Sequence, residues 1–138
     1  MITRYTIAAF ALLLTACGSG KTNELLQNKK WKVYDVTVPA SDPYNNIQVT
    51  QAKDLKNGYY SDVHYQFFKD GLFIATIAGQ PDSGRYKLLS NGRIISITAA
   101  DGSRTSEHLI EVTTLNEEEF DMKVKSGDYH FILHTRKQ

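Results

Sequence analysis

From residue 30 onward, apolar and polar residues alternate over short segments that turn-forming residues separate. This period of two is typical of β-strands with one buried face. The pattern predicts eight strands, at residues 30–38, 62–68, 72–78, 84–90, 93–98, 104–114, 119–125 and 128–136. Seven of them follow one another through short turns, which favours antiparallel pairing of neighbours in sequence order.

Two turns predict the register of the sheet. Lys69-Asp70-Gly71 is typical of a three-residue hairpin loop with glycine in the left-handed conformation, and it places Phe67 opposite Phe73. Asn91-Gly92 is the strongest two-residue hairpin signal. Across that second turn the apolar residues of the two strands align: Tyr86 and Leu88 with Ile95 and Ile97.

A meander of eight strands with one apolar face leaves no exposed edge when it closes on itself. We therefore predict an all-β fold, an eight-stranded antiparallel up-and-down barrel. A β-sandwich is the alternative, although it usually needs crossing connections that short hairpins do not allow.

Two segments outside the strands have helical character. Residues 22–29 predict a short N-terminal helical turn, with Leu25 and Leu26 able to plug one end of the barrel. The one long connection, residues 39–60, predicts a helix from Val49 to Lys56 that ends at Asn57-Gly58. Such a long loop is usually functional, and in a barrel it is expected to lie across one mouth.

The first residues predict export. Arg4 precedes an uncharged apolar run, residues 5–14. That run is shorter than the about 20 residues that span a bilayer, and it is typical of a secretory signal. It ends in Leu14-Thr15-Ala16-Cys17, which resembles the bacterial lipobox. The resemblance implies that the thiol of Cys17 is diacylated and that this residue begins the mature lipoprotein.

Cys17 is the only cysteine, so we expect a mature domain that its core holds together without a disulfide. We divide the chain into a signal peptide (1–16), a lipidated tether (17–22) and a barrel domain (23–138). Acyl chains on Cys17 make the membrane a partner. Gly18 is not the acidic residue that signals inner-membrane retention in enteric lipoproteins. That resemblance implies lipid anchoring at the outer membrane, with the periplasmic and surface faces both open.

Charge and motifs argue against several function classes. The 16 basic and 15 acidic residues are interspersed, so no stripe for nucleic acid is present. No Gly-x-Ser-x-Gly elbow occurs, and an acylated Cys17 offers no nucleophilic thiol. His130 and His134 lie roughly 13 Å apart on a strand, too far to share a metal ion. We expect surface histidines, no metal, no cofactor and no catalytic residues.

The predicted interior is rich in large aromatic side chains. Eight strands enclose a lumen just wide enough for packed side chains or for one small ligand. Seven aromatic residues are predicted to point inward and are the candidate ligand-binding residues: Tyr65, Phe67, Phe73, Tyr86, Phe120, Tyr129 and Phe131. They are large enough to nearly fill the lumen, so a solid core competes with a pocket. Tyrosine hydroxyls inside need hydrogen-bond partners.

These features together resemble the lipocalins, and in particular the small bacterial lipocalin-like lipoproteins. Trp31 occupies the position of the tryptophan at the start of the family's first strand. Arg136 matches the basic residue that stacks over that tryptophan and closes the barrel. Residues 65–73 and 84–88 are similar to segments of these lipoproteins. The chain departs from the family at Lys29, where lipocalins have glycine.

Three functions are compatible with these features. The first is a membrane-anchored barrel that binds a small apolar or amphipathic ligand, and it requires a cavity of several hundred Å³. The second is a non-catalytic interaction module, an envelope-complex subunit or an inhibitor. It would bind a protein partner through the 39–60 loop or through outward Phe68, Leu72 and Ile74. The third is an enzyme, which requires titratable groups that converge in a pocket; no sequence feature places them there.

Overall fold

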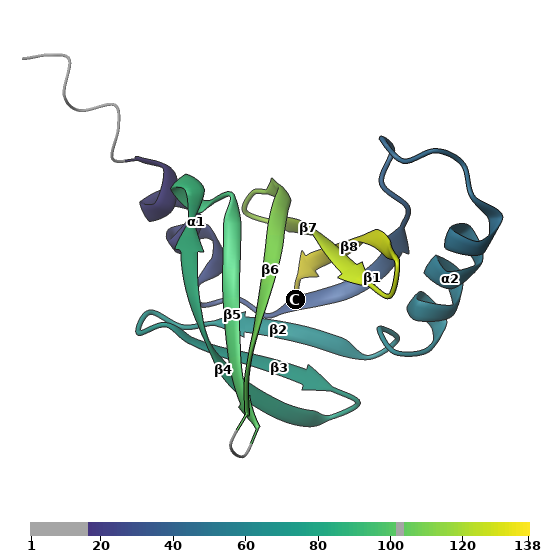
Figure 1. Ribbon diagram of the computed structural model, residues 1–138. Helices are drawn as coiled ribbons and strands as arrows, with labels where there is room; N and C mark the ends of the chain where they lie inside the picture. Colours follow the sequence, from purple (N-terminus) through teal and green to yellow (C-terminus); the bar gives the residue numbers. More distant parts are fainter. Residues whose placement is uncertain (1–16, 102–103) are drawn as a thin grey trace, which may run out of the picture.

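The computed structural model describes residues 17–101 and 104–138, and its eight strands close into one antiparallel barrel in sequence order (Figure 1). This confirms the predicted fold class. The elements are α1 (Cys17–Leu26), β1 (Trp31–Thr37), α2 (Asn46–Asn57), β2 (Val63–Phe67), β3 (Leu72–Ile77), β4 (Gln80–Leu89), the 3₁₀ turn η1 (Ser90–Gly92), β5 (Ile94–Asp101), β6 (Arg104–Leu115), β7 (Glu119–Ser126) and β8 (Tyr129–Lys137).

Some predictions lie outside the described residues. The predicted signal peptide comprises residues 1–16 and is among them. Among the helices that the structure describes, none has the length and apolar character needed to cross a bilayer.

Both predicted hairpins have the predicted register. Phe67 pairs with Phe73, and Gly71 has a φ of 85°, as the three-residue loop requires. Residues 86 and 88 pair with 97 and 95, as predicted. The predicted Asn91-Gly92 turn is closed by a hydrogen bond of 3.3 Å from the N–H of Arg93 to the carbonyl of Ser90, and the strand ladder ends one pair earlier, at Leu89 and Ile94, which leaves a four-residue loop. Three successive residues of that loop have positive φ: Ser90, Asn91 and Gly92.

One end of the barrel is filled by apolar side chains. Trp31 has no exposed surface, and its indole N–H donates to the carbonyl of Leu26 at 3.0 Å. Leu26, at the end of α1, is also fully buried, as expected of a residue that plugs the barrel. The helix begins at Cys17, so residues 17–22, predicted as a lipidated tether, are helical.

The cation over Trp31 is Lys29, whose Nζ lies 5.3 Å from the ring centroid. The predicted stacking of Arg136 on Trp31 is wrong. Arg136 pairs with Lys32 on the outside of the barrel, next to the inward, fully buried Thr135. Its guanidinium therefore stacks on the outer ring of Tyr34, with Cζ 3.8 Å from the centroid.

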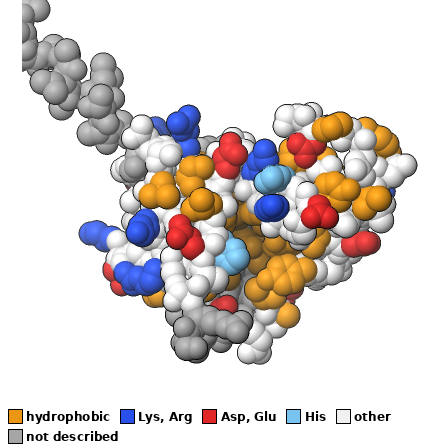
Figure 2. All heavy atoms as spheres, in the orientation of Figure 1, with side chains coloured by type: hydrophobic (Ala, Val, Ile, Leu, Met, Phe, Trp, Pro, Cys, Tyr) orange, Lys and Arg blue, Asp and Glu red, His pale blue; other side chains and the backbone are white. Residues whose placement is uncertain are grey.

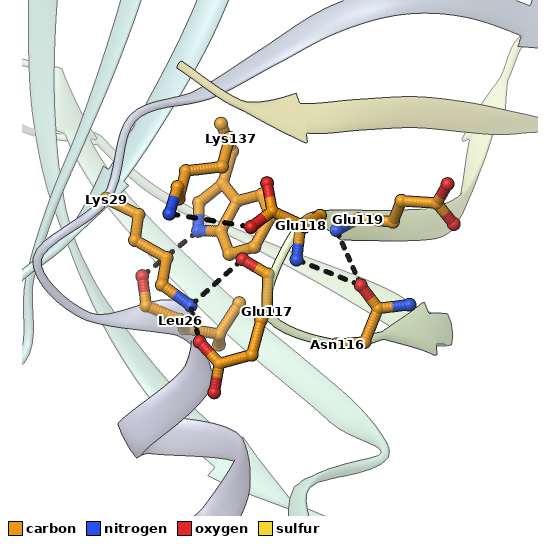
Figure 3. Close-up of polar contacts among 8 residues, drawn as sticks. Leu26, Lys29, Asn116, Glu117, Glu118, Glu119 and Lys137 are labelled. Atoms are coloured by element: carbon orange, nitrogen blue, oxygen red, sulfur yellow. Dashed lines mark hydrogen bonds and ion pairs between the residues drawn. The ribbon is translucent and has the colours of Figure 1, made fainter.

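Polar contacts fasten the β6–β7 turn over this closed end (Figure 3). Asn116 Oδ1 accepts hydrogen bonds from the backbone N–H groups of Glu118 and Glu119. Lys29 Nζ donates to Glu117 Oε2 at 3.1 Å, and the Nζ of Lys137 lies 3.6 Å from Glu118 Oε1. These contacts tie the segment after α1 to a turn far along the chain.

The long connection contains α2, which is longer than predicted and lies at the side of the barrel (Figure 1). Asn45 caps it by accepting hydrogen bonds from the N–H groups of Ile47 and Gln48. The helix packs against β1, where Lys56 and Asp35 form an ion pair at 3.3 Å. The start of the helix also contacts β8, where Gln48 Nε2 donates to the carbonyl of His130 at 3.0 Å.

The strand ladders are incomplete at two places. β1 and β2 pair only at Trp31–Tyr65 and Lys32–His64, and beyond that point α2 packs on β1 and adds buried Ala52 to the core. β6 and β7 pair from Leu115 back to Glu111, while residues 104–110 of β6 continue without a β7 partner. The barrel is thus closed near α1 and parted between β6 and β7 toward the other end.

Candidate functional site

A cavity of about 550 Å³ occupies the open half of the barrel. Its apolar wall comes from β2, β3, β5, β7 and β8, with Phe67, Phe73 and Met122 buried. Tyr59 and Tyr60 enter from the segment between α2 and β2. A cavity of this size falls within the 300–1,000 Å³ range of small-molecule sites.

The seven aromatic residues predicted to line the lumen divide into two groups. Tyr65, Phe67 and Phe73 line the cavity. Tyr86, Phe120 and Phe131 are buried in the core and do not line the cavity, and Tyr129 is half-buried against that core. The solid core and the pocket are therefore both present, in different halves of the barrel.

The cavity also opens sideways, where β6 and β7 part. His108, Leu109 and Ile110 of β6 line it on one side, and Val124 and Lys125 of β7 line it on the other. Leu109 is 61% exposed here. Figure 2 shows hydrophobic side chains gathered in a recess near the middle of this face.

Charged and titratable groups belong to the rim of the cavity. Asp82 and Glu107 contribute carboxylates, and His108 and Lys125 contribute an imidazole and an ammonium group. Glu107 Oε1 accepts a hydrogen bond from the buried hydroxyl of Ser96 at 3.0 Å. His108 was not predicted as a cavity residue, although its even spacing from Ile110 places both side chains on one face.

The inward tyrosines differ in whether the protein satisfies their hydroxyls. The Tyr86 hydroxyl donates to the Phe68 carbonyl at 2.8 Å, and the Tyr129 hydroxyl accepts from Asn45 Nδ2 at 3.1 Å. In the described parts of the chain, no group hydrogen-bonds to the hydroxyls of Tyr60 and Tyr65. Both of these residues line the cavity.

Burial raises the pKa of these two hydroxyls above the usual value for tyrosine. It raises the pKa of Tyr60 to about 12, with a smaller contribution from the neighbouring Tyr59. Burial also raises the pKa of Tyr65, and the nearby Tyr60 and Tyr59 add to the shift. Each phenol therefore remains an O–H donor at neutral pH.

A second polar cluster lies on the outer wall, across three adjacent strands. His134 Nδ1 lies 3.1 Å from Asp121 Oδ1, and His134 Nε2 lies 2.7 Å from the Thr37 hydroxyl. His134 is thus half-buried and bonded, rather than a free surface histidine. Nowhere in residues 17–101 and 104–138 do three or more metal-ligating side chains gather into a metal site.

The apolar residues predicted as a partner surface are only half-exposed. Phe68, Leu72 and Ile74 each have intermediate burial on the outer face. Among the described residues, the large apolar side chains with the highest exposure lie elsewhere, at Tyr44 and Ile47 near the start of α2 and at Leu109 beside the cavity.

The barrel is similar to those of solved bacterial structures. An uncharacterized protein from Bacteroides eggerthii matches with a TM-score of 0.51 and 18% identity, over 80% of this chain and 98% of that one. A DUF4847 family protein from Bacteroides vulgatus matches with a TM-score of 0.54 and 12% identity, over 83% and 95%. No family model and no curated protein sequence matches. These similarities support the barrel fold; the resemblance to lipocalin-like lipoproteins stays a prediction.

Proposed function

We propose that this protein is a membrane-anchored lipoprotein that binds a small apolar or amphipathic molecule in the cell envelope. The observation that carries the proposal is the cavity of about 550 Å³ in the open half of the barrel. Its aromatic and aliphatic wall favours an apolar ligand, because burial of apolar surface drives binding. Its rim mixes acidic and basic groups and favours no single sign of charge.

The anchoring part of the proposal rests on the sequence. The lipobox-like Leu14-Thr15-Ala16-Cys17 supports diacylation of Cys17, and two or three acyl chains hold a protein firmly to a membrane. Gly18 after the cysteine supports the outer membrane. We propose a binding role without catalysis, because the rim groups lie around an opening and are not enclosed with a nucleophile.

Native mass spectrometry tests the proposal directly. The lipidated protein is extracted gently from its own membrane, without refolding, and sprayed under increasing activation. We expect an excess small mass that survives mild activation and leaves under harsher activation. A bare barrel with another protein bound would instead support the interaction module.

A pair of variants on β3 links any cargo to the cavity. Ala75 faces the cavity, and Thr76 follows it on the outer face of the same strand. Ala75→Trp fills the cavity and is expected to abolish the excess mass. Thr76→Trp adds the same bulk outside and is expected to retain it. Equal retention by both variants would place the cargo elsewhere.

A further inference from the structure

Two phenol groups interrupt the apolar wall of the cavity on one side. Tyr65 comes from β2, and its ring stacks on Phe73 with centroids 5.8 Å apart. Tyr60 comes from the segment after α2, and its ring packs edge-on against Tyr59 at 4.8 Å. Each ring is held by an aromatic neighbour, and each residue lines the same cavity.

These hydroxyls stand out against the other inward tyrosines. Tyr86 and Tyr129 have hydrogen-bond partners within the protein, whereas the described residues offer none to Tyr60 and Tyr65. Neither hydroxyl is among the fully buried unpartnered atoms of the described residues, so water reaches both through the cavity, and a ligand that covers them must replace that water as a hydrogen-bond partner. A ligand that fills the cavity with apolar surface alone would displace water from both hydroxyls and would offer them no hydrogen bond in its place.

The electrostatics favour an uncharged acceptor at this place. Both phenols are donors at neutral pH, since an ordinary tyrosine has a pKa of about 10 and burial raises the pKa of each further. The one cationic side chain that lines the cavity among the described residues, Lys125, belongs to β7, away from β2. A carboxylate near the two tyrosines would be desolvated without a cation beside it, which is costly.

We infer that the ligand carries a carbonyl group on an otherwise apolar skeleton, and that Tyr60 and Tyr65 donate hydrogen bonds to its oxygen. A carbonyl oxygen has two lone pairs and accepts from two donors. The class includes ketones and esters of aromatic or aliphatic skeletons that fit the cavity. This inference rests on the proposed function and specifies the ligand of the same cavity.

Two naphthalenes that differ in one oxygen test the inference. The lipidated full chain is reconstituted in lipid nanodiscs, and 2-acetylnaphthalene and 2-ethylnaphthalene are measured by equilibrium dialysis against empty nanodiscs. We expect the ketone to bind about tenfold more tightly than the hydrocarbon, as one or two net hydrogen bonds provide. In Tyr65→Phe the preference is expected to fall to within about twofold, with the affinity for the hydrocarbon unchanged.

Tyr129→Phe is the matched control. It removes an inward phenol that Asn45 already satisfies, and it is expected to keep the preference for the ketone. Thermal unfolding monitored by circular dichroism establishes that each variant folds. If Tyr65→Phe is unfolded, Tyr60→Phe provides the same test, because its hydroxyl has no bond within the described protein to lose.

The outcomes separate this inference from the proposed function. Equal binding of the two compounds to the wild-type protein would overturn the role of the tyrosine pair and leave the apolar binding site standing. If the double variant Tyr60→Phe/Tyr65→Phe still prefers the ketone, the role of the tyrosine pair is also overturned and the apolar binding site still stands. Binding of neither compound, together with a bare barrel in native mass spectrometry, would overturn both.

Discussion

Trp31 joins the N-terminal helix to the barrel through a single side chain. The ring is fully buried, donates to the Leu26 carbonyl and packs edge-on against Phe120 with centroids 5.6 Å apart. We expect Trp31→Ala to lower the free energy of unfolding by about 3–5 kcal/mol in urea melts, because it leaves a cavity at the closed end. A loss below about 1 kcal/mol would be typical of a surface site and would contradict this role.

Arg136→Ala is the informative comparison. Its guanidinium stacks on the exposed ring of Tyr34, and an exposed cation–π contact contributes about 0.5–1 kcal/mol. A small loss in the same urea melts would agree with the outer position of Arg136. A loss of stability as large as that of Trp31→Ala would indicate that Arg136 does help to close the barrel.

Tyr60 and Tyr65 predict how the protein responds to alkali. In the folded state the pKa of Tyr60 is raised to about 12 and the pKa of Tyr65 is also raised, whereas an unfolded tyrosine has a pKa of about 10. Below about pH 10 both states keep these protons; above it the unfolded chain loses them first, so stability falls. We expect the urea midpoint to decline from about pH 10 upward, and less steeply in Tyr65→Phe. Exposed Tyr44→Phe, the control, should follow the wild type.

The sequence predicts Trp31 correctly and Arg136 incorrectly for one physical reason. Side chains alternate between the two faces of a strand, so a difference of one position decides which face a residue occupies. Trp31 lies in the inward row of β1, while Arg136 is next to inward Thr135. Tyr60 could not be predicted as a cavity residue, because it lies in the long connection, where no alternation defines a face.

The capped start of α2 fixes the position of the segment that leads to Tyr60. Asn45 accepts hydrogen bonds from two N–H groups of the helix and donates to the Tyr129 hydroxyl of β8. We expect Asn45→Ala to cost about 0.5–2 kcal/mol in urea melts, since the cap is lost. Asn57→Ala, at the other end of the helix, removes no cap and is expected to change stability by less than about 0.5 kcal/mol.

The alternation of apolar and polar residues, together with the turn residues, predicts which strands pair. It does not predict over how many residues two strands stay paired. Alternation and the Lys69-Asp70-Gly71 turn gave the correct register for Phe67 and Phe73. In β6 apolar and polar residues alternate only from Ile110 to Thr113, and residues 104–108 are all polar, so the pattern does not define how far β6 pairs with β7. That extent depends instead on twist and on a register shift between Val112 and Thr114, which arise only in the assembled barrel.

The molecule is divided along its axis into a closed end and an open end. α1, Trp31 and the β6–β7 turn lie at the closed end, and the β7–β8 turn lies at the other (Figure 1). Cys17, the proposed lipidation site, begins α1. The ten residues of that helix span about 15 Å. Anchoring through Cys17 is therefore expected to hold the closed end near the membrane and to turn the cavity away from it.

Cys17→Ser tests the anchor itself. The full chain is expressed in a bacterial host with radiolabelled palmitate, and membranes are separated from soluble extract. We expect the wild type to carry the label and to sediment with membranes, because two or three acyl chains bind firmly. Cys17→Ser should lose the label and leave the membrane fraction. Wild-type protein without label would overturn the lipoprotein part of the proposal.

The orientation can be measured with one fluorophore at either end of β7. Acylation consumes the only native thiol, so an introduced cysteine is the single site for labelling. Glu118→Cys lies at the closed end and Asp128→Cys at the open end, and both positions are exposed. The eight residues of β7 between them span about 26 Å. With the lipidated protein in vesicles that contain nitroxide lipids, we expect strong quenching at residue 118 and little at residue 128. Equal quenching would mean that the barrel lies on its side, and the reverse order would place the cavity against the membrane, where a ligand would enter directly from the bilayer.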